Sequence, residues 1–421
     1  MRQHEKAGLA AVSLLIFFTL GPATGRAQRS AAPVPLLKAG QSVDWWFVFK
    51  FNAAKFSGCG GGAQRACTFG GKVQRYPAFS QQFAVASSSA PELQMNNGCA
   101  GDTAADPLGA TFGQVYAGAF HYLIWNDQFY SDPEIQGCSD NCGAPWGHSK
   151  GLLAWNDAGD GVVLQVSTPS WPAAGSSATP RRSDGNTLGC VKDNDVKVSQ
   201  HFFALKINKA DLVSVLKALA NASVVTDPAN TQIVRNGGPA DVQALVKTLG
   251  QKSTSTEFTK ATLSSGITLI SKPSRLHVPP WQLVSAVLGG VSLRAATWWT
   301  RPKIPSTTPS TQVGCWDNAL PPPGAVEIAT NGTFAEQKFS LAGGPGADFN
   351  HAKVGVSISN ADGTALSIFG DMNQQGSLSG PNCGSSQNGR GGLFFVVDDP
   401  GLWKSVKALI TCEKCDTAPE K

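Results

Sequence analysis

The stretch APWGHSKGLLAWND, residues 144–157, guides the interpretation of the whole chain. It places His148 and Lys150 directly before an apolar run, in a chain of 421 residues that contains six histidines. The run 151–156 is bounded by glycine and by Asn-Asp, a pattern typical of a β-strand. Because residues i and i+2 of a strand point to the same face of a sheet, we expect this imidazole and this ammonium group to project together.

A second histidine and lysine pair occurs in the C-terminal part of the chain. His351 and Lys353 head the run 351–359, which also has strand character. Such a pair suits a phosphodiester, because lysine binds a non-bridging oxygen while the imidazole attacks phosphorus or transfers a proton. Two pairs facing each other across a pseudo-twofold axis would supply a nucleophile and an in-line proton donor without a metal. The tripeptide also arises by chance, so its spacing alone leaves a surface or hydrogen-bonded histidine as an open alternative.

The remaining pattern alternates strands with a few helices. Amphipathic spacing predicts a helix over 210–220, a proline start and a following glycine predict one over 239–249, and Asp399-Pro400 opens the last one. A layered α/β or α+β architecture, with sheets covered by helices, follows from this order. Further strands are predicted at 44–51, 121–126, 161–167, 201–207, 266–272, 294–299, 365–370 and 392–397.

Composition divides the chain further. Residues 168–189, 302–312 and 320–324 are rich in Pro, Ser and Gly and are predicted to be surface loops. A boundary is expected within 222–238, which lacks periodicity. The predicted organisation is a signal peptide at 1–27, a linker at 28–40, a first half at 41–222, a second half at 238–412 and a tail at 413–421.

The N-terminus and the cysteines indicate export. Two basic residues, an apolar run over 9–20 and a small-residue break are typical of a cleaved secretory signal, and no later segment is apolar enough to span a bilayer. The ten cysteines all follow the signal and are expected to form disulfides of unknown connectivity. Zinc is the alternative, since Cys412 and Cys415 have ligand-like spacing. The protein is expected to be secreted or exported, without a membrane anchor, to the periplasm, the cell exterior or a lysosome-like compartment.

The charge balance constrains the substrate only weakly. The net charge is +5 and the pI is about 8.6, but charged residues make up only 15% of the chain. This excludes the dense basic surface of a protein that binds nucleic acid by charge alone, while it permits a polyanionic substrate.

Short motifs along the chain carry a family resemblance. In the first half they are SVDWWFVFK, YLIWNDQ, GHSKGLLAWND with GVVLQVSTPSWP, and VSQHFFALKI. In the second half they are SGITLISK, WQLVSAVLGG to ATWW, FNHAKVGVS, FGDMNQ, GRGG and GLWKSVKALI. These pieces keep their order from residue 42 to 410, and VDWW, GHSKG and GDMN are the most specific. On these motifs, the sequence resembles the deoxyribonuclease II family of the phospholipase D superfamily.

The resemblance implies two phospholipase D-like halves, each a mixed sheet flanked by helices, with the active site at their pseudo-twofold junction. It implies an acid endonuclease that needs no cofactor or divalent metal and leaves 3′-phosphate and 5′-hydroxyl ends on DNA. His148 and His351 would be the catalytic histidines, with Lys150 and Lys353 as their phosphate-binding partners. We expect His148 to form a phosphohistidine and His351 to protonate the departing 5′ oxygen.

The sequence departs from the phospholipase D pattern HxK(x)4D, because Trp155 stands where the aspartate is expected. We therefore predict that Asp371 orients a histidine and that Asn373 binds a phosphate oxygen, with Asp371 as a simple turn residue the alternative. Asn126 is expected to close the pocket or end a strand. Further DNA-binding candidates are Trp45 or Trp46, of which alternation lets only one face a groove, and the basic residues Lys50 and Arg390.

Two other functions remain open from sequence alone. One is a phospholipase D-like phosphodiesterase or phosphotransferase, against which the missing aspartates count. The other is a non-catalytic nucleic-acid-binding protein of the same fold, against which the retained histidines and lysines count. The expected substrate is duplex DNA, and the protein is expected to form a homodimer. One neutral and one protonated histidine predict a bell-shaped pH profile of activity below neutrality.

Overall fold

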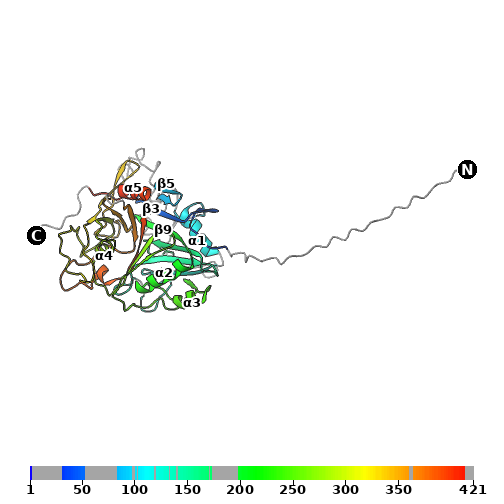
Figure 1. The fold of residues 1–421 in the computed structure, drawn as a ribbon, viewed down its shortest axis with the longest axis horizontal. Coiled ribbons are helices and arrows are strands. Elements are labelled where there is room, and N and C mark those ends of the chain that lie inside the picture. Colours follow the sequence, from blue (N-terminus) through cyan, green and yellow to red (C-terminus); the bar gives the residue numbers. More distant parts are fainter. Residues whose placement is uncertain are drawn as a thin grey trace. The chain divides into compact units, whose positions relative to one another are not determined.

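Two large β-sheets form the frame of the molecule in its computed structural model (Figure 1). The described residues from Ala31 onward belong to one compact unit. The predicted signal peptide and most of the loop 168–189 lie outside the described residues. The structure describes Met1 and residues 31–52, 83–96, 100–101, 103–117, 120–131, 133–138, 141–169, 171–172, 198–359 and 364–412.

The first sheet has eight strands in the order β10-β6-β7-β8-β9-β3-β4-β5, and every neighbouring pair is antiparallel. Its central strands carry apolar side chains on both faces and are buried throughout, so neither face of β3 or β7 is open to solvent. The strands are β3 (Trp45–Lys50), β4 (Phe83–Ser87), β5 (Ala90–Asn96), β6 (His121–Asn126), β7 (Lys150–Trp155), β8 (Gly161–Val166), β9 (Gln200–Ile207) and β10 (Val234–Arg235).

The second sheet has seven strands in the order β11-β12-β19-β18-β17-β13-β14, with a parallel pairing only between β13 and β14. Its stretch β13-β17-β18-β19-β12 repeats the succession β6-β7-β8-β9-β3 of the first sheet. The first HxK tripeptide runs into the second strand of its series, and the other lies directly before the second strand of its own. The strands are β11 (Thr259–Thr262), β12 (Thr268–Lys272), β13 (Leu293–Ala296), β14 (Val326–Ile328), β17 (Val354–Ser357), β18 (Leu366–Gly370) and β19 (Gly392–Asp398).

Helices cover the sheets and are marked by capping residues. Asn208 and Asp211 form a reciprocal capping box at the start of α2 (Lys209–Asn221), and Asp399 accepts from the Leu402 amide at the start of α5 (Pro400–Leu409). Helix α2 packs against β9 and also against β12 of the other sheet, so it ties the two sheets together. The remaining elements are β1 (Leu36–Lys38), β2 (Gln41–Ser42), α1 (Pro107–Ala117), α3 (Ala240–Val246), α4 (Pro280–Val287), β15 (Asn331–Phe334), β16 (Gln337–Ser340) and a 3-10 turn (Ser386–Gly389).

The sheets meet through aromatic side chains. The ring of Phe369 on β18 stacks on Phe47 of β3, with centroids 4.3 Å apart, and on Phe203 of β9, at 4.7 Å. Phe203 also contacts Phe395 of β19, at 5.5 Å. Each phenylalanine buried in this way contributes about 1.5–3 kcal/mol relative to an exposed ring. One hydrophobic core therefore spans both sheets and fixes their register beside the HxK tripeptides.

The predicted layered α/β class is confirmed, and the predicted strands 121–126 and 201–207 are found as β6 and β9. The segment 351–359 differs from its prediction, because strand β17 begins only at Val354. His351 and Lys353 therefore lie in the loop before the strand, and the strand-face argument does not apply to them. Their orientation is fixed by contacts with the opposite sheet, described below.

Two disulfides, Cys138–Cys142 and Cys315–Cys383, are found among the described residues. Cys412 is also disulfide-bonded, so the alternative that it binds zinc with Cys415 is wrong. No helix in the described part of the chain combines the length and apolar character needed to cross a membrane.

Candidate active site

A cavity of about 740 Å³ opens beside both HxK tripeptides. His148 reaches it from the loop before β7, and His351 and Lys353 reach it from the loop before β17. The two predicted histidines lie far apart in the sequence but line one cavity. Other residues that line it are Gln128, Tyr130, Asn141, Pro169, Trp298, Ala347, Asp348, Asn373, Gln375, Ser386, Gln387 and Arg390.

His148 is held from the opposite sheet at two points. Its main-chain N–H donates to the Gly391 carbonyl at 2.8 Å, and its Nδ1 lies 2.6 Å from the Asp371 carbonyl oxygen. A carbonyl oxygen can only accept, so Nδ1 carries a proton and the Nε2 of the neutral ring carries the lone pair. The preceding residue must be glycine, because a Cβ atom at Gly147 would lie 2.6 Å from the Ala222 carbonyl oxygen.

The neutral form of His148 is favoured by its surroundings. Burial is the main cause that holds the pKa of His148 well below its ordinary value of 6.5. The Asp127 carboxylate opposes this shift, while the cations of Lys150 and Arg390 add to it. The ring is therefore a candidate nucleophile at neutral and mildly acidic pH.

Lys150 does not join His148 at the cavity, contrary to the prediction from strand geometry. Its Nζ lies 2.5 Å from Oδ1 of Asp127, and it is absent from the residues that line the cavity. The prediction failed because His148 precedes β7 and only Lys150 belongs to that strand. A buried carboxylate, which the HxK pattern does not include, determines where the ammonium group points.

Asp127 is the site residue that sequence reasoning missed. It follows β6, is fully buried, and bonds Lys150 with one oxygen and Arg390 Nη2, at 2.7 Å, with the other. Burial would raise the pKa of Asp127, but the surrounding positive charges outweigh it and hold the pKa well below 3.8. The stretch WNDQ contained the signal, since it places an aspartate directly after a strand beside the HxK strand.

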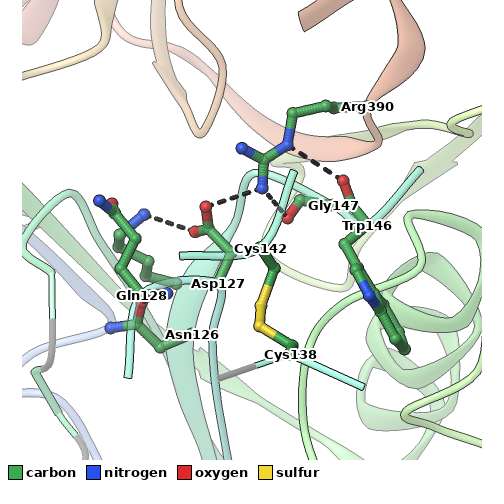
Figure 2. Close-up of a disulfide and its surroundings, with 9 residues drawn as sticks. Asn126, Asp127, Gln128, Cys138, Cys142, Trp146, Gly147 and Arg390 are labelled. Carbon is green, nitrogen blue, oxygen red and sulfur yellow. Dashed lines mark hydrogen bonds and ion pairs between the residues drawn. A yellow bond between two sulfur atoms is a disulfide. The ribbon is translucent and has the colours of Figure 1, made fainter. Parts of the chain in front are cut away.

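Arg390 links the two halves of the site. Its guanidinium donates to Asp127 and to the Trp146 and Gly147 carbonyls, at 3.1 and 2.8 Å for the carbonyls, as Figure 2 shows. It also lines the cavity. The predicted phosphate-binding candidate is thus placed at the site, and its donors fix the loop that precedes His148.

The second tripeptide is also held from the opposite sheet. The main-chain N–H groups of His351 and Ala352 both donate to the Ser199 carbonyl, at 3.0 and 3.1 Å. His351 Nε2 lies 2.9 Å from the Ala347 carbonyl oxygen, so Nε2 carries a proton and Nδ1 is the second ring nitrogen. Burial first, and then the Lys353 ammonium, lower the pKa of His351 from 6.5 to about 3.

His201 supports the second tripeptide, although no lysine follows it at the HxK spacing. It is fully buried on β9, and its Nδ1 accepts the main-chain N–H of Lys353 at 3.1 Å. Burial and the Lys353 charge hold the pKa of His201 well below 6.5, which keeps the ring neutral and able to accept this bond. The contact joins residues 152 positions apart, so no local pattern could reveal it.

Asp371 contacts His148, but through its main chain. Its carbonyl oxygen accepts from His148, while its carboxylate accepts from Gln165 Nε2 at 3.1 Å and from the Leu393 amide at 2.9 Å. The prediction that the carboxylate itself orients a histidine is therefore corrected. Burial raises the pKa of Asp371 from 3.8 to about 7, against hydrogen bonds from Ser149, Leu393 and Gln165.

The two asparagine candidates have different positions. Asn373 lines the cavity, and its buried Oδ1 has no hydrogen-bond partner in the structure. Asn126 is fully buried, donates to the Thr168 and Trp171 carbonyls, and accepts from the Gln128 amide. Asn126 therefore ends β6 and fixes the adjoining loops, and it is not among the residues that line the cavity.

The DNA-binding candidates on β3 are corrected by their burial. Trp46 is fully buried, with its indole N–H on Thr111 of α1, and Trp45 is 8% exposed in the same core. The prediction that one of them faces a groove is wrong, because other elements cover both faces of the strand. Lys50 is also fully buried, and its Nζ donates to the Val198 carbonyl, so it presents no surface for a DNA phosphate.

No set of three or more His, Cys, Asp or Glu side chains within the described ranges is arranged to hold a metal ion. The positive charges at the cavity come from Lys353 and Arg390. These side chains suit an anionic ligand such as a phosphodiester.

Comparison with known proteins agrees with this site. The sequence model of the family described as Deoxyribonuclease II matches residues 35–415, which include both HxK tripeptides. A search of curated proteins found no match. The chain therefore belongs to the deoxyribonuclease II family and is a deoxyribonuclease, a hydrolase that acts on DNA phosphodiester bonds.

Proposed function

We propose that the protein is an acid, divalent-metal-independent endodeoxyribonuclease that works through a phosphohistidine on His148. The observation that carries the proposal is the pair of histidines at one cavity, one of which has Nδ1 bonded to a carbonyl. That bond leaves the outer nitrogen of His148, Nε2, with its lone pair for attack. On His351 the nitrogen without this bond is Nδ1, which is next to the ring carbon that carries Cβ and is more hindered, so we prefer His148 as nucleophile.

In the first step, Nε2 of His148 attacks phosphorus and forms the P–N bond while the P–O5′ bond breaks. The departing 5′ oxygen takes a proton from protonated His351, which gives a 5′-hydroxyl end and neutral His351. The Nδ1–H of His148 remains on the Asp371 carbonyl, which holds the ring and stabilises the positive charge that the phosphohistidine carries.

In the second step, water attacks the phosphorus of the phosphohistidine. His351 accepts a proton from this water, and the P–N bond breaks to restore the His148 lone pair. The product is a 3′-phosphate, and His351 is again protonated for the next cycle. The same histidine thus acts as acid and then as base, as microscopic reversibility requires.

Lys353 and Arg390 are the residues that we propose to hold the non-bridging phosphate oxygens, since both are cations at the cavity. Lys150 has a different proposed role. Its ion pair with Asp127 fixes the carboxylate, which in turn fixes Arg390. Lys150 therefore acts on the phosphate indirectly, through these two side chains. Asn373, with an unpaired buried oxygen at the cavity, is proposed to orient water or the sugar.

The pKa values support an acid optimum. Above its pKa of about 3, the protonated fraction of His351 in the free protein falls about tenfold per pH unit, so the supply of general acid falls as pH rises. A bound phosphodiester would raise this pKa by opposing the Lys353 charge. We therefore expect DNA cleavage to lie on the acidic side of neutrality.

We also propose that each large sheet and its helices form one half of a pseudo-twofold pair, because the two sheets share a five-strand order. The disulfides are consistent with export to an oxidising compartment. A cavity between two halves suits duplex DNA, and a homodimer would present two such sites.

The test is plasmid cleavage from about pH 3 to pH 9, with and without EDTA, followed by end-group analysis. The proposal requires faster cleavage in acid, no effect of EDTA, and 3′-phosphate ends. Cleavage that is fastest above about pH 8, or that stops in EDTA and returns with magnesium, would overturn it. Release of choline from phosphatidylcholine without DNA cleavage would favour a phospholipase instead.

A further inference from the structure

One exposed aromatic side chain lies at the cavity. Tyr130 is 40% exposed, and among the described residues it is the one aromatic side chain counted among the exposed large hydrophobic residues. It lines the cavity that contains both histidines. An exposed aromatic ring beside a site for nucleic acid offers a flat face on which a base can stack.

The backbone presents this ring in a costly conformation. Tyr130 and Ser131 have φ values of 51° and 61°, in the left-handed region that residues with a Cβ atom rarely adopt. Such conformations concentrate at functional sites. The side-chain amide of Gln128 also donates to the Tyr130 hydroxyl, with Nε2 3.3 Å from the oxygen, which orients the ring.

We propose that Tyr130 forms a stacking subsite for one nucleobase next to the scissile phosphate. This inference rests on the proposed cleavage of DNA at this cavity. The ring replaces the role expected for Trp45 or Trp46, both of which are buried. Stacking tolerates all four bases, so the subsite would increase affinity for DNA without setting a sequence preference.

The test compares Tyr130→Ala and Tyr130→Phe on single-site oligonucleotides, with and without an abasic nucleotide at each position flanking the cleaved bond. We expect Tyr130→Ala to lower kcat/KM on intact DNA about tenfold and Tyr130→Phe to keep it within about twofold. At one flanking position, the abasic nucleotide should lower kcat/KM of the wild type by about the same factor. At that position it should not lower kcat/KM of Tyr130→Ala any further. Equal losses at all positions, or an unaffected Tyr130→Ala, would overturn the inference while leaving the nuclease assignment intact.

A second, independent observation concerns two buried lysines at equivalent places in the sheets. Lys50 ends β3 and pairs with Gln200 of β9, and Lys272 ends β12 and pairs with Gly392 of β19. Lys50 Nζ donates to the Val198 carbonyl at 2.6 Å, and Lys272 Nζ to the Arg390 carbonyl at 2.9 Å. In both sheets the acceptor lies two residues before the paired residue.

The next carbonyl in each segment crosses to the opposite HxK tripeptide. The Ser199 carbonyl accepts from His351, and the Gly391 carbonyl accepts from His148. Lys272 also donates to the Asn388 and Pro273 carbonyls, at 2.8 and 3.2 Å, so all three ammonium protons have an acceptor. Each lysine is therefore one residue away from the carbonyl that holds a histidine.

We infer that Lys50 and Lys272 are positioning residues, with Lys272 controlling His148 and Lys50 controlling His351. Loss of Lys272 would misplace the nucleophile, and loss of Lys50 would misplace the general acid. These two defects differ in chemistry, because only the second can be relieved by a leaving group that needs no proton. This inference rests on the proposed histidine roles.

The test uses Lys50→Met and Lys272→Met, with DNA and with thymidine 3′-(p-nitrophenyl phosphate), which releases p-nitrophenolate without an acid. We expect both variants to lose about 100-fold in kcat on DNA. In the pre-steady-state burst of p-nitrophenolate, Lys50→Met should stay within about threefold of wild type, while Lys272→Met should again lose about 100-fold. Lys206→Met is the control, since Lys206 lies on β9 with its side chain 56% exposed.

Near-UV circular dichroism checks that the variants are folded, and Lys50→Gln and Lys272→Gln replace any methionine variant that is not. Equal losses on the two substrates for both lysines would overturn the inference, as would failure of both replacements to fold, which would make the lysines folding determinants only. A His148→Ala protein that cleaves DNA at the wild-type rate would instead count against the phosphohistidine mechanism.

Discussion

The two HxK tripeptides share a spacing but differ in how they are built into the protein. In the first, the histidine lines the cavity while the lysine turns away to a buried aspartate, and the histidine ring is held through Nδ1. In the second, histidine and lysine both line the cavity, and the ring is held through Nε2. The comparison shows that contacts made far away in sequence hold two histidines of the same short pattern in different ways. In the proposed mechanism, this difference makes His148 the nucleophile and His351 the general acid.

The largest expected difference between the tripeptides is kinetic. His148→Ala should lower cleavage of DNA and of thymidine 3′-(p-nitrophenyl phosphate) by at least about 10⁴-fold, because no nucleophile remains. His351→Ala should lower DNA cleavage about 10²- to 10⁴-fold but still release a burst of p-nitrophenolate, because that leaving group needs no acid. Stopped-flow absorbance measures the burst. A burst from His148→Ala and none from His351→Ala would reverse the two roles.

The second prediction concerns the aspartate that distinguishes the first tripeptide. Asp127→Asn removes the charge between Lys150 and Arg390, so two buried cations lose their partner. The free energy of unfolding should fall by about 3–5 kcal/mol, measured by urea denaturation. Asp157→Asn is the control, because the Asp157 side chain is 85% exposed and its pair with His121 should be worth less than about 1 kcal/mol. If both variants lose a similar free energy of unfolding, the buried ion pairs of Asp127 stabilise the protein no more than the exposed pair of Asp157 does.

The third prediction concerns how ionisation of the Asp371 carboxyl group changes the stability of the protein with pH. Its carboxyl stays neutral up to about pH 7 in the folded protein, while an unfolded chain ionises near 3.8. The stability from this group is therefore complete below pH 3.8 and is lost as pH rises through 7, a change of about 4 kcal/mol. The Asp371→Asn side chain cannot ionise, so this variant lacks the pH-dependent loss. Its free energy of unfolding relative to wild type should therefore rise by up to this amount between acid and neutral pH.

Urea denaturation of both proteins across this pH range measures the difference. Any constant loss from altered hydrogen bonds to Gln165 and to the Leu393 amide cancels when the two proteins are compared across pH. If the two proteins keep a constant difference in unfolding free energy across the range, the carboxyl of Asp371 titrates normally.

The limits of sequence reasoning follow from which contacts are local. Strands such as β6 and β9 were predictable because their apolar runs and bounding turns lie within a few residues. Both histidines were predictable because each precedes such a run. The turn of Lys150 toward Asp127 was not, since its cause lies 23 positions away in a neighbouring strand.

The same reason accounts for the other corrections. Alternation along β3 predicted one exposed face, but a core that spans two sheets and helix α1 cover both faces, which buries Trp45 and Trp46. The contacts of His148 with Gly391 and of Lys353 with His201 join distant parts of the chain. They depend on how the sheets pack, which hydrophobic periodicity does not encode.

The most direct test of the account is to identify the histidine that becomes covalently attached to phosphorus. His351→Ala protein is mixed with thymidine 3′-(p-nitrophenyl phosphate), quenched in alkali, digested, and analysed by mass spectrometry. If His148 is the nucleophile, a thymidine phosphate adduct should form on the peptide that contains His148, because attack proceeds while hydrolysis lacks its base. An adduct on any other residue, or p-nitrophenolate release without an adduct, would contradict it.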